Sequence, residues 1–349
     1  MSVELEHHIG QSTSPQCLAI HPSNQLYLYS SGANLITASL TSTTKQRLLP
    51  PIHDAPISCL ALSPSGRFGV SAQEGEFSNV YVWDFNREQV LYSLEEHDNK
   101  VQALGFSHDE KLLATLGGEG DGKLIIWDLS NGMIVSSSGK VPPETICLAL
   151  GGFVRDVKRR ETHKYQMCTG GRNGVVLWEL DPFTGVLEAF PAIAEARGTT
   201  SRYISAVAYS LDGEKVIALT TTGDFLVVNL RTRRIVGAMA VAKAALESIA
   251  IYRGGMIIGC ADRSLQIFDH NCEFRRSIRL PSPAVALSVT LESPEVIAVT
   301  SNGSTLRINM DNLQVIVLAE SHSNSVVAVA FSEASNDRFA TASSDGTVR

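Results

Sequence analysis

The sequence lacks the long apolar runs and paired cysteines that mark several common protein classes. No apolar run in the 349 residues reaches the ~18–20 residues that a membrane-spanning helix needs. The stretch from Met1 to Pro15 is too polar for a signal peptide. The six cysteines include no C-x-x-C pair of the kind that binds zinc or performs redox chemistry. We therefore expect an intracellular protein with reduced cysteines and no membrane partner.

Basic residues are also scarce, which argues against general binding of nucleic acid. The chain has 29 Lys and Arg against 36 Asp and Glu, a formal charge of −7, whereas binding to phosphates needs a dominant positive field. Histidines are scattered over predicted turns and termini, and no Ser or Cys lies in a nucleophile-elbow setting. We expect no enzyme, no resident cofactor or metal, and no small-molecule substrate.

What the sequence does contain is a repeated unit, seen most completely from Glu95 to Leu129. Short apolar runs at Val101–Phe106 and Leu112–Gly117 are separated by a turn-prone tetrapeptide, which predicts two adjacent buried strands. A third run follows at Lys123–Asp128, and a weaker one begins at Met133. The Trp-Asp pairs that begin at Trp83 and Trp127 lie 44 residues apart, within the ~40–45 residues of one propeller blade.

Similar units follow one another along the whole chain. We predict an all-β propeller of seven four-stranded blades over residues 1–320, because stacked repeats share a continuous core. The alternating segment Val3–Ile9 can complete the last blade and close the ring. Residues 321–349 begin a further unit, whose next Trp is expected just beyond Arg349. We interpret this unit as the start of a truncated second propeller; an eighth blade of the same ring is the alternative.

These residues resemble the WD-repeat family. In that family a His before the first strand, a hydroxyl on the second, an Asp in the next turn and a Trp on the third form a hydrogen-bonded network. The resemblance places this structural network at His97, Thr115, Asp121 and Trp127; at His53, Ser71 and Trp83; at Trp178; and at His322, Ser343 and Asp345. Buried polar groups need such partners once water is excluded. The second unit offers only Glu74 or Glu76 where Asp is usual.

The densest basic cluster interrupts the fourth unit at Arg155 to Arg160. Arg155, Lys158, Arg159 and Arg160 are candidate partner-binding residues, because loops on a rigid scaffold commonly carry recognition. A solvated loop without a partner is the alternative. A second insertion, Asp181 to Arg202, is expected on the opposite face of the ring.

A narrower resemblance connects the chain to the cilia- and flagella-associated WD-repeat proteins that line axonemal doublet microtubules. It rests on the LEEHDNKVQALGFSHDEKLLATLGGEGDGKLIIWDL unit and on the segments TGGRNGVVLWELD and LTTTGDFLVVNLRT. The resemblance implies a structural protein of the cytoskeleton, located in the cilium or flagellum axoneme, with tubulin and other axonemal proteins as partners. A soluble cytoplasmic adaptor or substrate receptor in a larger complex is the alternative function.

Overall fold

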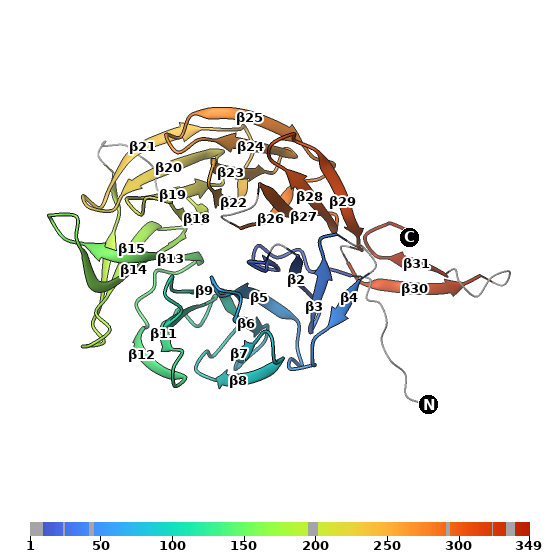
Figure 1. The fold of residues 1–349 in the computed structure, drawn as a ribbon, viewed down its shortest axis with the longest axis horizontal. Coiled ribbons are helices and arrows are strands. Elements are labelled where there is room, and N and C mark those ends of the chain that lie inside the picture. The colour runs from blue at the N-terminus through green and yellow to red at the C-terminus, as the bar shows by residue number, and fades with distance from the viewer. Residues whose placement is uncertain are drawn as a thin grey trace.

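The protein is a closed ring of β-sheets. The computed structural model describes residues 10–23, 25–41, 45–194, 202–290, 294–322, 324–332 and 339–349. Over these residues all regular secondary structure is β, and seven sheets stand radially around a central axis (Figure 1). The described part contains no helix long and apolar enough to cross a membrane. The predicted all-β propeller with seven four-stranded blades is confirmed.

Each blade consists of consecutive strands that run antiparallel from the centre of the ring outward. Blades 1 to 3 contain β1 (Leu18–Ile20), β2 (Leu26–Ser31), β3 (Asn34–Ser39) and β4 (Gln46–Leu48); β5 (Ile57–Leu62), β6 (Phe68–Gln73), β7 (Val80–Asp84) and β8 (Gln89–Leu94); and β9 (Val101–Phe106), β10 (Leu112–Gly117), β11 (Leu124–Asp128) and β12 (Met133–Ser138). Blade 4 contains β13 (Thr145–Arg155), β14 (Glu161–Gly171), β15 (Gly174–Leu180) and β16 (Leu187–Pro191).

The remaining blades follow the same order. Blade 5 contains β18 (Ile204–Tyr209), β19 (Lys215–Thr220), β20 (Asp224–Asn229) and β21 (Arg234–Ala240), with β17 (Ile193–Ala194) added parallel to β21 at its outer edge. Blades 6 and 7 contain β22 (Leu246–Tyr252), β23 (Gly255–Cys260), β24 (Ser264–Phe268) and β25 (Phe274–Arg279); and β26 (Ala284–Val289), β27 (Glu295–Thr300), β28 (Ser304–Asn309) and β29 (Val315–Glu320).

The hydrophobic core lies between neighbouring blades. All six residues of β10 are buried, whereas no residue of the outer strand β12 is buried, so burial falls from the middle of a blade to its rim. Val82 of blade 2 packs in one cluster with Leu104 and Trp127 of blade 3. Burying one such aliphatic side chain stabilises the fold by ~1.5–3 kcal/mol. Because each blade covers the face of the next, the ring is held by packing around its whole circumference.

The ring closes by direct packing of blade 1 on blade 7. Ile36 and Val299 belong to one buried cluster that joins these two blades. The backbone N–H of Ile20 donates a 3.0 Å hydrogen bond to Ser288 Oγ across the same boundary. Seven blades therefore complete the ring. The strand predicted at Val3–Ile9 lies outside the described residues.

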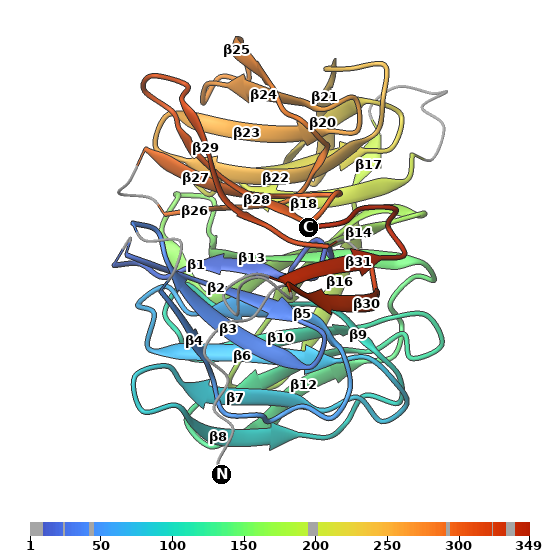
Figure 2. The same cartoon turned by 90° about the vertical axis from the view of Figure 1, so that its right-hand side faces the viewer.

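The last unit forms a separate two-stranded sheet outside the ring. Its strands β30 (Val326–Phe331) and β31 (Phe339–Ser343) lie over the boundary between blades 7 and 1 (Figures 1 and 2). Arg349 Nη1 lies 2.9 Å from Glu320 Oε2 at the end of blade 7. The alternative of an eighth blade within the ring is therefore wrong. That residues 321–349 begin a second propeller stays a prediction.

The antiparallel order of the strands gives the ring two different faces. Turns between first and second strands, and between third and fourth strands, lie on one face, which we call the hairpin face. Turns between second and third strands and the connections between blades lie on the opposite face, which we call the connection face. This division decides which of the predicted residues can act together.

Candidate functional site

In blade 3 the structure brings all four network residues together. His97 Nδ1 lies 2.6 Å from Asp121 Oδ2, and His97 Nε2 lies 2.8 Å from Thr115 Oγ1. The indole N–H of Trp127 donates to Thr115 Oγ1 over 3.0 Å. One protonation pattern satisfies every contact: Nδ1–H donates to the carboxylate, and Nε2 accepts from the threonine hydroxyl. These hydrogen bonds connect the segment that precedes β9 with the third strand of the blade.

Burial favours the neutral form of His97. Burial lowers the pKa of His97 from its usual 6.5, and this effect exceeds the opposing influence of the Asp121 carboxylate. A neutral imidazole beside a carboxylate and a hydroxyl has the elements of a catalytic triad. However, the Thr115 hydroxyl already accepts a hydrogen bond from Trp127, and the side chains of His97 and Asp121 have no exposed surface. The geometry therefore fits a structural network.

Blade 2 contains a different version of the network. His53 Nε2 lies 2.7 Å from Ser71 Oγ, as the family resemblance implies, but His53 Nδ1 lies 3.1 Å from Gln73 Oε1. Gln73 in turn donates to Asp54 Oδ1 over 2.8 Å. Gln73, not Glu74 or Glu76, thus takes the position of the usual Asp. Little in the sequence indicated that Gln73 would bond the histidine, because the family pattern has an Asp in the turn and no glutamine at the end of the second strand.

The prediction that Trp83 joins this network is wrong. Its indole nitrogen is buried and has no hydrogen-bond partner among the described residues. The strand register is the same as in blade 3, but Trp83 pairs with Gly69, whereas Trp127 pairs with Leu113. A Cβ added at Gly69 would clash with the Trp83 ring. The missing side chain at Gly69 therefore lets the indole lie over the neighbouring strand, away from the serine.

The last unit also forms a network, but with a different hydroxyl from the one predicted. His322 Nε2 lies 2.8 Å from Thr341 Oγ1, and His322 Nδ1 lies 2.9 Å from Thr347 Oγ1 and 3.3 Å from Asp345 Oδ2. Ser343 instead donates to the backbone oxygen of Asn324 over 3.0 Å. The assignment of Ser343 to the network is therefore wrong. Thr341 and Ser343 are two positions apart on one strand and point the same way, so the pattern alone does not separate them.

Blade 4 retains only the Trp–Thr hydrogen bond of the network. Trp178 Nε1 donates to Thr169 Oγ1 over 2.9 Å, and no histidine lies at the inlet of β13. Asn173, at the position of the turn Asp, donates instead to the backbone oxygen of Pro143. Trp178 is nevertheless 1% exposed. Packing, with a single indole bond, holds this blade.

Blades 5 and 7 use a different threonine, at the last position of the second strand where blade 3 has Gly117, and sequence reasoning missed it. Thr220 Oγ1 donates to the backbone oxygen of Asp224 over 2.7 Å, and Thr300 Oγ1 donates to that of Ser304 over 2.9 Å. Each threonine therefore ties the end of a second strand to the start of the third strand. Blades without the Trp close the same turn locally.

The basic segment of blade 4 is an extension of two strands. β13 and β14 each have 11 residues, and their pairing continues to Arg155 opposite Glu161. Asp156 organises the tip: its carboxylate accepts from the backbone N–H groups of Lys158 at 2.8 Å and Arg160 at 2.9 Å. The Arg160 backbone N–H is the first cause of the lowered pKa of Asp156. The expected loop is thus an ordered hairpin on the hairpin face.

The four basic side chains of this hairpin have different surroundings. Arg155 Nη1 donates to the backbone oxygen of Asp212 over 3.1 Å, and Arg160 Nη2 lies 2.8 Å from Asp156 Oδ2. Arg159 Nη1 lies 3.7 Å from Glu214 Oε1, although 75% of its side chain is exposed. Lys158 is exposed and has no ion pair within the described residues. Arg155 and Arg160 therefore support the hairpin, while Lys158 and Arg159 are the more available of the four.

The expectation that the two insertions lie on opposite faces is wrong for the start of the second one. Asp181 Oδ2 lies 3.3 Å from Nε2 of His163, which is on the extended hairpin. The next apolar residue, Phe183, is 83% exposed, and its ring centroid is 5.3 Å from that of His163. This turn therefore belongs to the hairpin face. Ile193 and Ala194 then form β17, and residues 195–201 lie outside the description.

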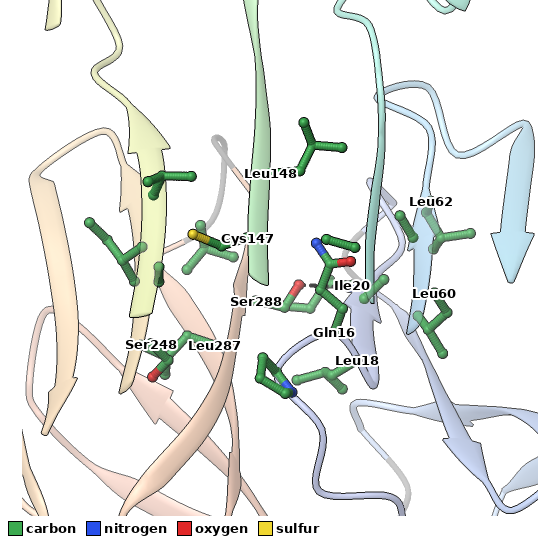
Figure 3. Close-up of a pocket in the computed structure, with 18 of the residues that line it drawn as sticks. Gln16, Leu18, Ile20, Leu60, Leu62, Cys147, Leu148, Ser248, Leu287 and Ser288 are labelled. Carbon is green, nitrogen blue, oxygen red and sulfur yellow. Dashed lines mark hydrogen bonds between the residues drawn. The ribbon is translucent and has the colours of Figure 1, made fainter. Parts of the chain in front are cut away.

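The centre of the ring encloses a cavity of about 680 Å³ (Figure 3). Gln16, from the segment before β1, lies in it and reaches blade 3: its side chain accepts from Leu104 N at 3.0 Å and donates to Leu104 O at 3.3 Å. Among the residues that line the cavity, Glu247 is the one carboxylate, and burial raises its pKa. Apolar and hydroxyl side chains make up most of the wall, and no cluster of metal ligands occurs in the described part.

Comparison with known families identifies WD repeats in this chain. The family described as "WD domain, G-beta repeat" matches residues 88–128 and 313–349. These two segments include His97 and His322. Each of these histidines precedes the first strand of its unit and bonds both a threonine and an aspartate. The match and the seven radial sheets agree on the architecture.

The similar proteins include two that are associated by name with cilia and flagella. Cilia- and flagella-associated protein 52 of Chlamydomonas reinhardtii is 30% identical over 258 residues, which cover 72% of this chain and 40% of the relative. The protein of the same name from Bos taurus is 25% identical over 351 residues, covering 98% of this chain and 54% of the relative. WD repeat-containing protein 90 of Mus musculus is 27% identical over 163 residues, which cover 46% of this chain and 8% of the relative. The chain spans about half the length or less of these relatives.

Proposed function

We propose that this WD-repeat propeller is a non-enzymatic scaffold of the ciliary or flagellar axoneme, and that tubulin is among the proteins it binds. The observation that carries the proposal is the ordered basic hairpin of blade 4 on an otherwise acidic protein. Between residues 153 and 164 the hairpin has five basic and two acidic side chains, whereas the whole chain has a formal charge of −7. This contrast gives the hairpin a local charge of the opposite sign.

The closed ring supports a scaffolding role. Blades packed on both sides form a rigid platform, and turns on such a platform hold a fixed geometry that suits recognition. The hairpin is fixed further because Arg155 bonds to the next blade and Asp156 orders the tip. The similarity to cilia- and flagella-associated protein 52 of two organisms supports the axoneme as the location.

Electrostatics supports an acidic partner surface such as that of tubulin. Lys158 and Arg159 are exposed at the tip, and Arg160 has 72% of its side chain exposed despite its bond to Asp156. An exposed charge pair contributes only ~0.2–1 kcal/mol, so binding must combine several pairs with other contacts. The proposal therefore predicts a distributed interface without a single essential residue.

Extraction of axonemes tests the proposed location and separates it from a soluble adaptor. The full-length protein carrying a fluorescent tag is expressed in ciliated cells, and the membrane and soluble matrix are removed with detergent. A scaffold remains on the extracted axonemes together with tubulin. If the protein is released with the soluble fraction, the adaptor function is correct and the axonemal scaffold is not.

A further inference from the structure

A second cavity lies on the hairpin face, between blades 5 and 6. It has a volume of about 340 Å³, at the lower end of the ~300–1,000 Å³ typical of ligand pockets. Ile217, Ile251 and Met256 contribute apolar side chains to its wall. Leu211 also lines it and is 46% exposed. The pocket therefore presents a small apolar surface to the outside.

The pocket is continuous with the basic hairpin of blade 4. The turn that connects β18 and β19 contains Asp212, which lines the pocket and whose backbone oxygen accepts the 3.1 Å hydrogen bond from Arg155. Two residues later, Glu214 lies 3.7 Å from Arg159. One turn thus borders the apolar pocket on one side and the basic hairpin on the other. A single extended segment of another protein can contact both.

The carboxylates at the pocket are already held by donors of this chain. Asp212 accepts from the Ser210 hydroxyl at 2.5 Å and the Glu214 backbone N–H at 2.9 Å. Asp269, on the blade 6 side, accepts from backbone N–H groups and pairs with Arg275. The basic side chains of the hairpin tip are less engaged, since Lys158 has no ion pair among the described residues. Lys158 and Arg159 are therefore the exposed cations that an outside carboxylate can approach at this surface.

We propose that this surface binds an acidic segment of a partner protein that inserts one bulky apolar side chain into the pocket between blades 5 and 6. The acidic residues of the segment lie along the blade 4 hairpin, opposite Lys158 and Arg159, and the apolar side chain contacts Leu211 and Met256. This proposal rests on the proposed function, because it assigns an acidic partner to the same hairpin. Beyond the proposed function, it adds one apolar side chain, the apolar anchor, that binds in the pocket and so fixes where the acidic segment lies along the hairpin.

Binding of synthetic peptides to the whole chain tests the proposal. The probes are a fluorescently labelled glutamate-rich peptide with one Phe, the same peptide with Phe→Ser, and a Phe-containing version with glutamine in place of glutamate. Burying the aromatic ring predicts about tenfold or tighter binding of the first peptide than of the second. The glutamine version is expected to bind weakest, because it lacks the charge complementarity. Equal binding of the first two peptides overturns the proposal.

Two pocket variants locate the apolar contact. Leu211→Asn places an uncharged polar group at the exposed edge of the pocket, and Cys272→Leu fills part of its volume from the blade 6 side. Both are expected to remove most of the preference for the Phe peptide while leaving the weaker binding of the Ser peptide unchanged. Retention of the full preference in both variants overturns the proposal.

Charge reversal at the hairpin separates this proposal from the proposed function. Lys158→Glu with Arg159→Glu is expected to weaken both acidic peptides severalfold, and Lys45→Glu with Arg87→Glu, at exposed positions of blades 1 and 2, is the matched control. If the hairpin variant weakens binding but the pocket variants do not alter the Phe preference, the apolar anchor is wrong and the acidic partner stands. If the hairpin variant binds as the control does, both the anchor and the role of the hairpin are wrong.

Discussion

Blades 3 and 4 are neighbours with the same Trp–Thr hydrogen bond, yet they differ at both ends. Blade 3 has a buried histidine and aspartate on the connection face and a short turn on the hairpin face. Blade 4 has no such histidine, and its first two strands continue into a basic hairpin. The difference indicates that closed hydrogen bonds stabilise blade 3, while the extension of blade 4 packs Tyr165 and Phe153 into the core and places basic side chains on the surface.

Replacing the shared threonine gives the largest expected contrast between these blades. Thr115→Val leaves two buried groups without partners, the Nε2 atom of His97 and the indole N–H of Trp127, and is expected to cost roughly 2–5 kcal/mol of unfolding free energy. Thr169→Val strands only the indole N–H of Trp178 and is expected to cost roughly 1–3 kcal/mol. Denaturant titration of both variants measures the difference. Equal losses would mean that the histidine adds nothing to blade 3.

Lowering the pH weakens blade 3 through its histidine. Because burial lowers the pKa of His97 from 6.5, the unfolded chain takes up a proton at a higher pH than the folded chain does. Stability is therefore fully present above pH 6.5 and is lost as pH falls below it, by at most about 1.4 kcal/mol per pH unit for one proton.

The control for this pH effect is His97→Gln. Its unfolding free energy is expected to be lower at pH 7 and to decline less steeply towards pH 5 than that of the wild type. His53 also has a pKa lowered by burial, so some decline remains. Parallel curves for the two proteins would show that His97 does not carry the effect.

Blade 2 allows the contribution of the indole hydrogen bond to be measured, because its tryptophan lacks the bond that Trp127 makes in blade 3. Trp127→Phe removes a donor that bonds Thr115, whereas Trp83→Phe removes an N–H that has no partner among the described residues. Both lose the same side-chain volume, so Trp127→Phe is expected to cost ~1–2 kcal/mol more. Thermal or denaturant unfolding measures both variants. A larger loss for Trp83→Phe would contradict the unpaired state of that indole.

The strands and the blade 3 network could be predicted from the sequence because both depend on local spacing. A period of 44 residues and alternating apolar positions locate blades, and 18 residues separate His97 from Thr115, as they separate His53 from Ser71. In the last unit the separation is 19, which selects Thr341 and not Ser343. Where two hydroxyls share one side of a strand, only the three-dimensional pairing decides between them.

Other features depend on contacts between distant residues and could not be predicted. The free indole of Trp83 follows from the absence of a side chain at Gly69 on the neighbouring strand. The pocket between blades 5 and 6 combines turns from two blades, and Gln16 reaches Leu104 from 88 positions away. No spacing rule describes such contacts. The basic cluster was visible in the sequence, but its ordering by Asp156 and its place beside Asp212 were not.

The central claim is that the basic side chains of the blade 4 hairpin contribute to binding in the axoneme while the core of the ring holds the fold. Changing Arg155, Lys158, Arg159 and Arg160 together to Glu is expected to alter unfolding free energy by no more than about 2 kcal/mol, since each exposed position contributes about 0.5 kcal/mol or less. A control variant changes four exposed basic residues on other blades to Glu: Lys45, Arg87, Arg276 and Arg279. Because Arg155 and Arg160 also support the hairpin, the pair Lys158→Glu and Arg159→Glu is measured alongside.

Quantitative incorporation of the tagged full-length protein into detergent-extracted axonemes tests this claim most directly. The measurement compares the amount retained per tubulin for the wild type, the hairpin variants and the control, after equal stability has been verified. The hairpin variants are expected to be retained severalfold less than the wild type, and the control equally. Unchanged retention of the fourfold hairpin variant would contradict the claim and remove the hairpin from the interface.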